Sequence, residues 1–255
     1  GEESGVATVL RGGWQGKDAT IANADGVKRP GYRLTGWEDA TTGDPITLGG
    51  TIPAISENRT LNAVWEIALY NVTYDANTLD PVDYMPSNIT GKTYNTSITI
   101  AEKAPYLSGY DFLYWKTTGI DGTEMHFGPN NGFTMPDNDV VLTAVWVART
   151  SPIYYHANGG NGGTVEGARV FTDAVATVSG NMFSRPGYRF LGWSEKSATA
   201  GVSRQPGDTF YMPPRQVNFY AQWEKLTYSV TYIVTGGTGN LDGSTPYAVY
   251  TDLGY

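Results

Sequence analysis

Cysteine is absent from this 255-residue sequence, and histidine occurs only twice, at His126 and His156. Without cysteine the chain lies outside the disulfide-rich class of small secreted domains, and it has neither a thiol nucleophile nor a thiolate metal ligand. The two histidines occur in unlike segments, and no spacing brings a serine, a histidine and a carboxylate together as a triad requires. The sequence therefore predicts a protein that is not an enzyme and holds no cofactor.

Long apolar runs and clustered basic residues are lacking too. No run reaches the roughly 18 apolar residues that mark a candidate membrane-spanning helix. The formal net charge is −8, and no basic stripe is present that could neutralise the phosphates of a nucleic acid. We therefore expect no membrane span in this segment and no nucleic-acid partner.

Oxygen-rich loops of the calcium-binding kind are also missing. Segments 121–124, 136–139 and 236–242 are rich in Asp, Asn and Gly. A calcium site needs about six to eight oxygen ligands with regularly spaced carboxylates, and none of the three segments has that spacing. We interpret them as turns, where these residue types are common, and predict no metal site.

Glycine, proline and aromatic residues are abundant instead, with 32 Gly, 14 Pro, 18 Tyr, 8 Phe and 7 Trp. This composition favours strands and turns around aromatic cores. The aromatic residues also recur, because Trp37, Trp115 and Trp193 are each 78 residues apart. A tandem array of one unit explains that spacing. The recurring aromatic positions, which we predict to be core residues, are Tyr32, Trp37, Trp65, Tyr110, Trp115, Trp146, Tyr188, Trp193 and Trp223.

The spacing divides the chain into repeats at 1–67, 68–148 and 149–225, followed by the opening hairpin of a truncated fourth repeat at 226–255. The first repeat starts late in this register, so its opening strand is missing, or Val6–Leu10 serves as a shortened one. A lone hairpin is marginal in water, so we expect 226–255 to pack on the third repeat or to complete the first repeat of another molecule. Linkers of two to six residues favour a semi-rigid rod.

Each repeat carries a turn, a strand that follows it, and a closing strand. Arg29–Trp37 and Arg185–Trp193 are the best-preserved copies of the first motif, in which Pro-Gly predicts a turn that starts a strand. Strand alternation places Phe190 and Trp193 on opposite faces. The glycine before the tryptophan predicts close approach of a neighbouring chain.

Other segments complete the unit. A connection at 99–104 is long enough for a short helix. The closing strands are Leu61–Trp65, Leu142–Trp146 and Phe219–Trp223. Opening strands follow at Tyr70–Asn77, Ile153–Gly160 and Tyr228–Tyr232. A further strand of each repeat ends near an aromatic residue, and the residues aligned at this position are Trp14, Tyr94, Phe171 and Tyr250.

Taken in order, these motifs resemble the Listeria–Bacteroides repeat, the B-repeat family named for internalin B. Tyr155–Gly160 resembles the family's opening motif, with His156 in place of Asp, and Arg185–Trp193 resembles its middle motif in full. Leu142–Trp146 and Phe219–Trp223 resemble its closing motif. The second repeat departs most, since it lacks the Arg-Pro pair and has Tyr114 in place of the glycine.

The resemblance implies a β-grasp-like domain used in tandem on large secreted or wall-anchored bacterial surface proteins. With the possible helix, we expect a β-rich α+β fold of small β-grasp-like repeats arranged as an elongated rod. Family members serve mostly as stalks and spacers, and some contact host components. We therefore expect an extracellular, non-catalytic segment on the bacterial surface or in a secreted protein.

Alternatives from other functional classes remain open: a glycan-binding module, and an accessory region of a large secreted enzyme. Neighbouring repeats are the expected partners, together with a host or cell-surface protein or a glycan. Aromatic residues that do not recur are the candidates for a ligand surface, because rings stack on sugar faces. They are Phe127, Phe133, Phe210 and Tyr211.

Overall fold

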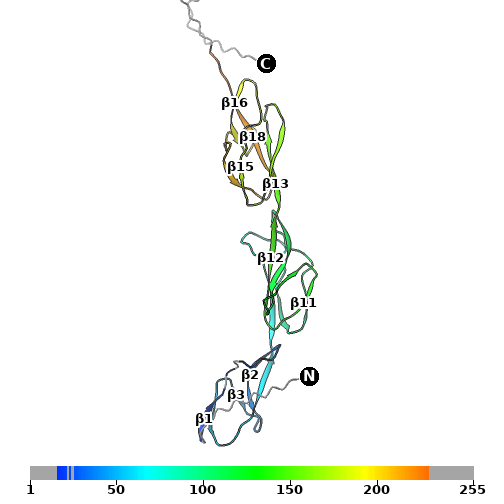
Figure 1. Cartoon of the computed structure of the whole chain (residues 1–255), viewed down its shortest axis with the longest axis vertical. Coiled ribbons are helices and arrows are strands. Elements are labelled where there is room, and N and C mark those ends of the chain that lie inside the picture. Colours follow the sequence, from blue (N-terminus) through cyan, green and yellow to red (C-terminus); the bar gives the residue numbers. More distant parts are fainter. Residues whose placement is uncertain (1–15, 22, 24–25, 230–255) are drawn as a thin grey trace, which may run out of the picture. The chain divides into compact units, whose positions relative to one another are not determined.

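A computed structural model of the chain describes residues 16–21, 23 and 26–229. The expected strand at Val6–Leu10, the slot of Trp14 and nearly all of the hairpin expected at 226–255 lie outside those residues. Strands are the only regular secondary structure in the described part (Figure 1). The α component of the expected α+β fold is therefore wrong, and the described fold is all-β in tandem repeats.

The connection at 99–104 illustrates why no helix forms. Strand β8 (Ser97–Thr99) ends there, and the chain continues without regular structure. Pro105 disfavours the helical conformation of the residue before it, and six residues give too few bonds to offset the cost of nucleating a helix. Ile100, only 1% exposed, instead anchors the connection in the core.

Contact density divides the described chain into two compact units, and the division falls inside the second repeat. Residues up to Pro105, with Leu113–Val145, form one unit. Tyr106–Phe112, with the residues from Trp146 onward, form the other. The first unit thus holds repeat 1 and most of repeat 2, and the second holds repeat 3 with the turn that opens the middle strand of repeat 2.

Repeat 1 contains a three-stranded and a two-stranded antiparallel sheet. The three-stranded sheet has the order β3 (Pro45–Thr47), β2 (Tyr32–Asp39), β5 (Leu61–Ile67). The two-stranded sheet pairs β1 (Lys17–Thr20) with β4 (Thr51–Ile55).

Repeat 2 has a five-stranded sheet and a two-stranded one that pairs β8 with β11 (Gly132–Thr134). The larger sheet has the order β10 (Glu124–Phe127), β9 (Tyr110–Thr118), β12 (Val140–Ala148), β6 (Leu69–Asp75), β7 (Ile89–Thr93). Strands β12 and β6 run parallel, so the closing and opening strands of the repeat lie side by side at its centre.

Repeat 3 repeats this plan. Its main sheet has the order β14 (Thr164–Phe171), β13 (Thr150–His156), β18 (Val217–Lys225), β16 (Tyr188–Ser194). Strands β13 and β18 are again the parallel pair, and they lie together in Figure 1. A small sheet pairs β15 (Val175–Thr177) with β17 (Thr209–Tyr211). The main core lies on one face of the larger sheet and includes Tyr155, Trp193 and Phe219, each fully buried.

The strand after the Pro-Gly turn does not alternate regularly. A β-bulge between Phe190 and Gly192 shifts the register of β16 against β18. Both Phe190 and Trp193 therefore face the core, with ring centroids 5.0 Å apart, and the expected placement on opposite faces is wrong. Repeat 1 has the same shift between Leu34 and Gly36. An extra residue at a bulge lets two non-alternating side chains share one face.

The glycine at the bulge allows the close approach predicted from the sequence. A Cβ on Gly192 would lie 2.6 Å from Val202 Cγ1 and 2.9 Å from the carbonyl oxygen of Arg204. In repeat 2 the same position is Tyr114, whose ring instead stacks on His126 at 4.1 Å between centroids. The departure of repeat 2 from the motif is therefore matched by a compensating ring contact.

Candidate functional site: the junctions between repeats

The turn before each middle strand has the same backbone geometry in all three repeats. The amide of the tyrosine donates to the carbonyl three residues earlier, from Tyr32 to Arg29, Tyr110 to Leu107 and Tyr188 to Arg185. The turn glycines Gly31, Gly109 and Gly187 have φ angles of 79°, 82° and 76°. A left-handed residue at this position of a turn favours glycine, which explains the recurring Gly-Tyr pair.

The chain that leaves each repeat is bonded to that turn. Ala68, Arg149 and Leu226 each donate a backbone N–H to the carbonyl of the turn glycine, at 2.9, 2.8 and 2.8 Å. These bonds join the end of each closing strand to the turn of the same repeat. The start of the following repeat is thereby held against the turn.

The following repeat also covers the turn glycine at both junctions within the described chain. A Cβ on Gly31 would lie 2.7 Å from Tyr94 Cβ. A Cβ on Gly109 would lie 2.7 Å from Thr172 Oγ1 and 2.5 Å from Pro214 Cβ. No side chain larger than hydrogen fits at Gly31 or Gly109 without displacing the next repeat.

Backbone bonds show that these covering residues occupy equivalent positions. Asn95 donates to the carbonyl of Met135, and Asp173 donates to that of Met212. Tyr94 therefore corresponds to Thr172. The sequence had aligned Tyr94 with Phe171, and that alignment is wrong by one residue. By the same register, Asp137 and Pro214 each stand two residues after the methionine.

Side-chain contacts differ between the two junctions. At the first, Asp137 Oδ1 accepts the Gly31 N–H at 2.7 Å and also accepts the Tyr70 hydroxyl. Burial, followed by the hydrogen bond and negative charge of Asp137, raises the pKa of Tyr70 to about 12. The phenol therefore stays protonated as a donor well above neutral pH.

At the second junction a phenol from the earlier repeat reaches the later one. The Tyr110 hydroxyl donates to Asp173 Oδ2 at 2.7 Å. Arg149 forms an ion pair with Asp111, whose hydrogen bond raises the pKa of the guanidinium. This pair is half exposed, so water and salt screen it, and we regard the buried turn contacts as the stronger restraint.

The recurring aromatics differ in depth. Trp115 and Trp193 have no exposed surface, and Trp193 donates its indole N–H to the carbonyl of Ser179 at 3.0 Å. The closing tryptophans lie nearer the surface and pack edge-to-face on the middle strand, Trp146 on Phe112 at 5.5 Å and Trp223 on Phe190 at 5.7 Å. Trp37, Trp65, Tyr110 and Tyr188 are half-buried, and Tyr32 is exposed.

The four aromatic residues predicted to form a ligand surface differ in their burial and in their packing partners. Phe133 and Phe210 occupy equivalent positions in β11 and β17, so this pair does recur. Phe133 packs on Phe127 at 5.2 Å, and Phe210 packs edge-to-face on the buried Phe219 at 5.7 Å. Tyr211 differs from them, because 75% of it is exposed.

Tyr211 belongs to a set of apolar residues that repeat 3 exposes and that repeat 2 replaces with small polar ones. Val175 is its cross-strand partner, and Phe171 lies at the end of β14 before the turn into β15. We call Phe171, Val175 and Tyr211 the repeat-3 patch; all three are exposed. Their counterparts in repeat 2 are Thr93, Ser97 and Thr134.

Both histidines lie on strands of the main sheets and form side-chain hydrogen bonds, His126 through Nε2 and His156 through both ring nitrogens. His126 contacts Glu124 at 2.6 Å, and this hydrogen bond lowers the pKa of the carboxyl. His156 lies between Thr164 and Asn218 and stacks on Tyr220 at 4.5 Å. In the described part of the chain, no three His, Asp or Glu side chains gather in a group that could hold a metal ion.

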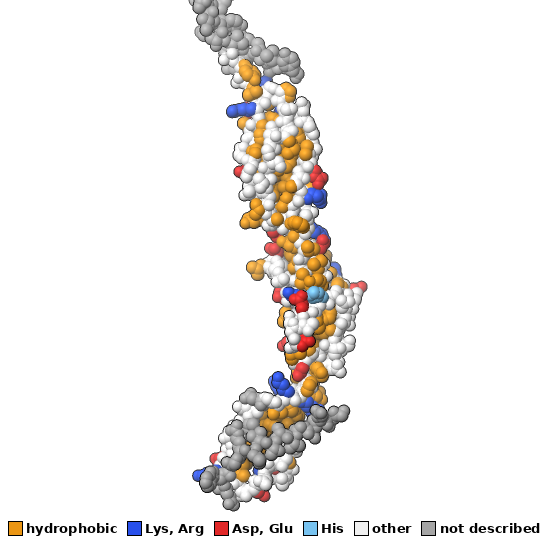
Figure 2. All heavy atoms as spheres, in the orientation of Figure 1, with side chains coloured by type: hydrophobic (Ala, Val, Ile, Leu, Met, Phe, Trp, Pro, Cys, Tyr) orange, Lys and Arg blue, Asp and Glu red, His pale blue; other side chains and the backbone are white. Residues whose placement is uncertain are grey.

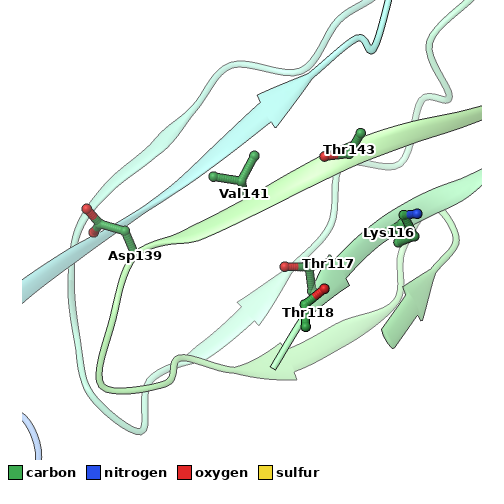
Figure 3. A pocket seen from close by; sticks show the side chains of 6 residues that line it. All are labelled: Lys116, Thr117, Thr118, Asp139, Val141 and Thr143. Carbon is green, nitrogen blue, oxygen red and sulfur yellow. The ribbon is translucent and has the colours of Figure 1, made fainter. Parts of the chain in front are cut away.

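An open hollow lies on the surface of repeat 2. Figure 3 shows its lining side chains on β9 and at the start of β12. They are Lys116, Thr117, Thr118, Asp139, Val141 and Thr143. Three threonine hydroxyls, one ammonium and one carboxylate thus line the hollow beside Val141. On the face drawn in Figure 2, basic side chains are scattered among acidic and apolar ones rather than gathered in a patch.

The Listeria-Bacteroides repeat domain matches residues 70–145 and 152–222 of this chain. This chain belongs to the Listeria-Bacteroides repeat family. The two matches lie within repeats 2 and 3. The family is typical of bacterial surface proteins.

Two relatives come from Evansella cellulosilytica. One, named as a Gly-rich membrane protein, is 28% identical over 176 residues, which cover 66% of this chain and 20% of that protein. The other, named as a membrane protein, is 28% identical over 182 residues, which cover 71% of this chain and 26% of that protein. The chain thus spans about a fifth to a quarter of the length of these relatives.

Within the residues that the structure describes, no helix is long and apolar enough to cross a membrane.

The covering residues of the junctions were not found from the sequence. A signal was present, because Met135-Pro136 and Met212-Pro213 recur at a fixed distance before the closing tryptophan. Sequence alone could not pair this loop with the turn of the preceding repeat, since the contact joins residues far apart in the chain.

Proposed function

We propose that this chain is a non-catalytic spacer segment of a bacterial cell-surface or secreted protein, with neighbouring repeats as its principal partners. The observation that carries the proposal is the recurrence of one junction. At both described junctions, a turn glycine accepts the outgoing backbone N–H and is covered by the same loop and strand end of the next repeat.

Such junctions suit a spacer for a physical reason. Short links with fixed backbone bonds restrict the angles that successive repeats can adopt, and each repeat needs only its neighbours. Extension is then set by the number of repeats, while loss of one repeat leaves the others folded. We infer an elongated, semi-rigid arrangement of the repeats in solution.

Small-angle X-ray scattering of the full chain tests this proposal. We expect a distance distribution with an early maximum and a long tail, as elongated particles give. Asp137→Ala removes the carboxylate that accepts from Gly31 and Tyr70, and should broaden the distribution by freeing repeat 1. A symmetric, bell-shaped distribution from the unmodified chain would contradict the spacer proposal.

A second candidate function, adhesion to a host or cell-surface glycan or protein, is favoured by the repeat-3 patch. The patch exposes two aromatic rings and one aliphatic side chain at positions where repeat 2 has Thr or Ser, and exposed apolar patches often mark binding sites. Aromatic rings can also stack on the faces of sugars.

The chain supplies its own control for this candidate. A triple variant would replace the patch with the residues of repeat 2, as Phe171→Thr, Val175→Ser and Tyr211→Thr. Binding of the unmodified chain to a glycan or host-protein array, lost in the triple variant while the melting temperature is kept, would support adhesion. Equal binding by both chains would assign any ligand to another surface.

A further inference from the structure

The open hollow on the main sheet of repeat 2 is large enough for a small ligand and has a polar lining. Its volume is about 340 Å³, within the range of roughly 300–1,000 Å³ that is usual for ligand sites. Its lining side chains lie on β9 and around the start of β12 (Figure 3). Three of them, Thr117, Thr118 and Thr143, carry hydroxyls, and none of these hydroxyls forms a hydrogen bond within the described part of the chain. The three groups are therefore available to a ligand.

The hollow follows from the strand that extends this sheet. The turn after β9 is closed by a bond from the Gly119 N–H to the carbonyl of Thr123, and Asp121 Oδ1 accepts the Thr123 N–H. Strand β10 then pairs with β9, from Glu124 opposite Thr118 onward. Because the chain leaves β9 by this hairpin, it extends the sheet sideways instead of folding over it.

Repeat 3 closes the equivalent position with a loop. Its middle strand β16 ends at Ser194, which corresponds to Lys116 in the 78-residue register and has no exposed surface. The loop that follows packs on β18, because its carbonyls at Ser197 and Ala198 accept from Gln222 Nε2 at 3.4 and 3.3 Å.

Larger side chains also fill this face in repeat 3. The closing strands align Thr143 with Tyr220 and Val141 with Asn218. The Tyr220 ring stacks on His156, and Asn218 is hydrogen-bonded to that histidine. The hollow is therefore a property of repeat 2 and not of the fold that the two repeats share.

The uncharged part of the lining suits a ligand rich in hydroxyls. A hydroxyl both donates and accepts hydrogen bonds, so three of them match a ligand whose groups do the same. Val141 is 50% exposed and adds an apolar surface. His126 is the cross-strand partner of Lys116, and its ring stacks on Tyr114 beside the hollow. Sugars combine hydroxyls with apolar C–H faces that pack on such surfaces.

The charges around the hollow disfavour an anion. Lys116 Nζ lies 3.4 Å from Glu124 Oε2, and Asp139 Oδ1 accepts the Asn71 N–H at 2.7 Å. One ammonium thus stands with two carboxylates, which repel a phosphate or a carboxylate ligand. Among the described residues, no group of three His, Asp or Glu side chains lies here to hold a metal ion. A neutral ligand avoids the repulsion.

We propose that this hollow binds a neutral saccharide. The hydroxyls of Thr118 and Thr143 hydrogen-bond to the hydroxyls of the sugar, and Val141 packs on an apolar face of its ring. This site goes beyond the spacer function, which the scattering experiment tests by itself. It is also distinct from the repeat-3 patch, since all of its lining residues belong to repeat 2.

A glycan array with neutral, acidic and amino sugars tests the proposal on the full chain, followed by calorimetry with the strongest neutral hit. One variant, Thr118→Val with Thr143→Val, keeps the shape of both side chains and removes both hydroxyls. Another, Thr143→Tyr, introduces the residue of repeat 3 and fills the hollow. The matched control, Thr99→Val with Thr134→Val, makes the same change on the exposed small sheet of repeat 2. Melting temperatures establish that each variant is folded.

We expect both hollow variants to weaken binding about tenfold or more, because one loses hydrogen bonds to the sugar and the other loses the space for it. The matched control and the triple variant of the repeat-3 patch should bind as the unmodified chain does. Binding of no neutral glycan, or of acidic glycans alone, would overturn the proposal. Unchanged affinity in both hollow variants would overturn it too, and so would an equal loss in the matched control.

Discussion

At the scale of single residues, buried aromatic rings account for the core of each repeat. Trp193 is fully buried, and its ring centroid lies 4.8 Å from that of Tyr155 and 5.0 Å from that of Phe190. Its indole N–H donates a hydrogen bond to a backbone carbonyl. Trp223 is only half-buried, although it recurs as regularly in the sequence. Recurrence therefore identifies residues that the repeat needs, whereas their depth differs between strands and, at the position of Trp37, between repeats.

Trp193→Ala should lower the free energy of unfolding of repeat 3 by about 3–5 kcal/mol, because it removes a large ring and leaves a cavity. Repeats 1 and 2 should stay folded, since coupling in an array is local. Denaturant unfolding followed by repeat-specific hydrogen exchange measures both effects. A cost below about 1 kcal/mol would show that the ring contributes little to the core.

At the scale of elements, turn and strand were predictable from sequence, but their packing was not. The Pro-Gly pair predicted the turn, since proline fixes φ and glycine allows φ 76° at Gly187. The bulge at Gly192 was missed, because strict alternation was assumed and a bulge changes which side chains share a face. The sequence left open whether 99–104 holds a short helix, and none forms there because Pro105 and burial of Ile100 favour an irregular connection.

The first junction should respond to alkaline pH through Tyr70. Its folded pKa is raised from 10 to about 12, so the protonated phenol is the favoured form in the folded state. The associated stability is fully present below pH 10 and is lost as pH rises from 10 to about 12. Asp137→Asn removes the neighbouring charge and should lower the pKa of Tyr70 toward its usual value.

Ultraviolet titration, taken as the difference between each protein and its Tyr70→Phe variant, isolates this phenol from the other tyrosines. An unchanged Tyr70 pKa in Asp137→Asn would show that the carboxylate does not act on it, leaving burial as the whole cause.

At the scale of the whole molecule, the sequence predicted a tandem array from the spacing of its aromatics, and membership of the Listeria-Bacteroides repeat family is confirmed. The contacts that join the repeats could not be predicted from the sequence, because Tyr94 and Asp137 contact Gly31 from distant parts of the chain. Sequence alignment also placed Tyr94 one residue out of register, since its neighbours are too variable to fix the slot.

The most direct test of the spacer account asks whether neighbouring repeats reorient together in solution. Residual dipolar couplings of backbone amides in repeats 2 and 3, measured in a weakly aligned sample of the full chain, report the alignment of each repeat separately. The account predicts that one alignment tensor fits both repeats, because the Gly109 turn, Thr172 and Pro214 fix the second junction. Two unrelated tensors of reduced magnitude would show independent motion and contradict the account.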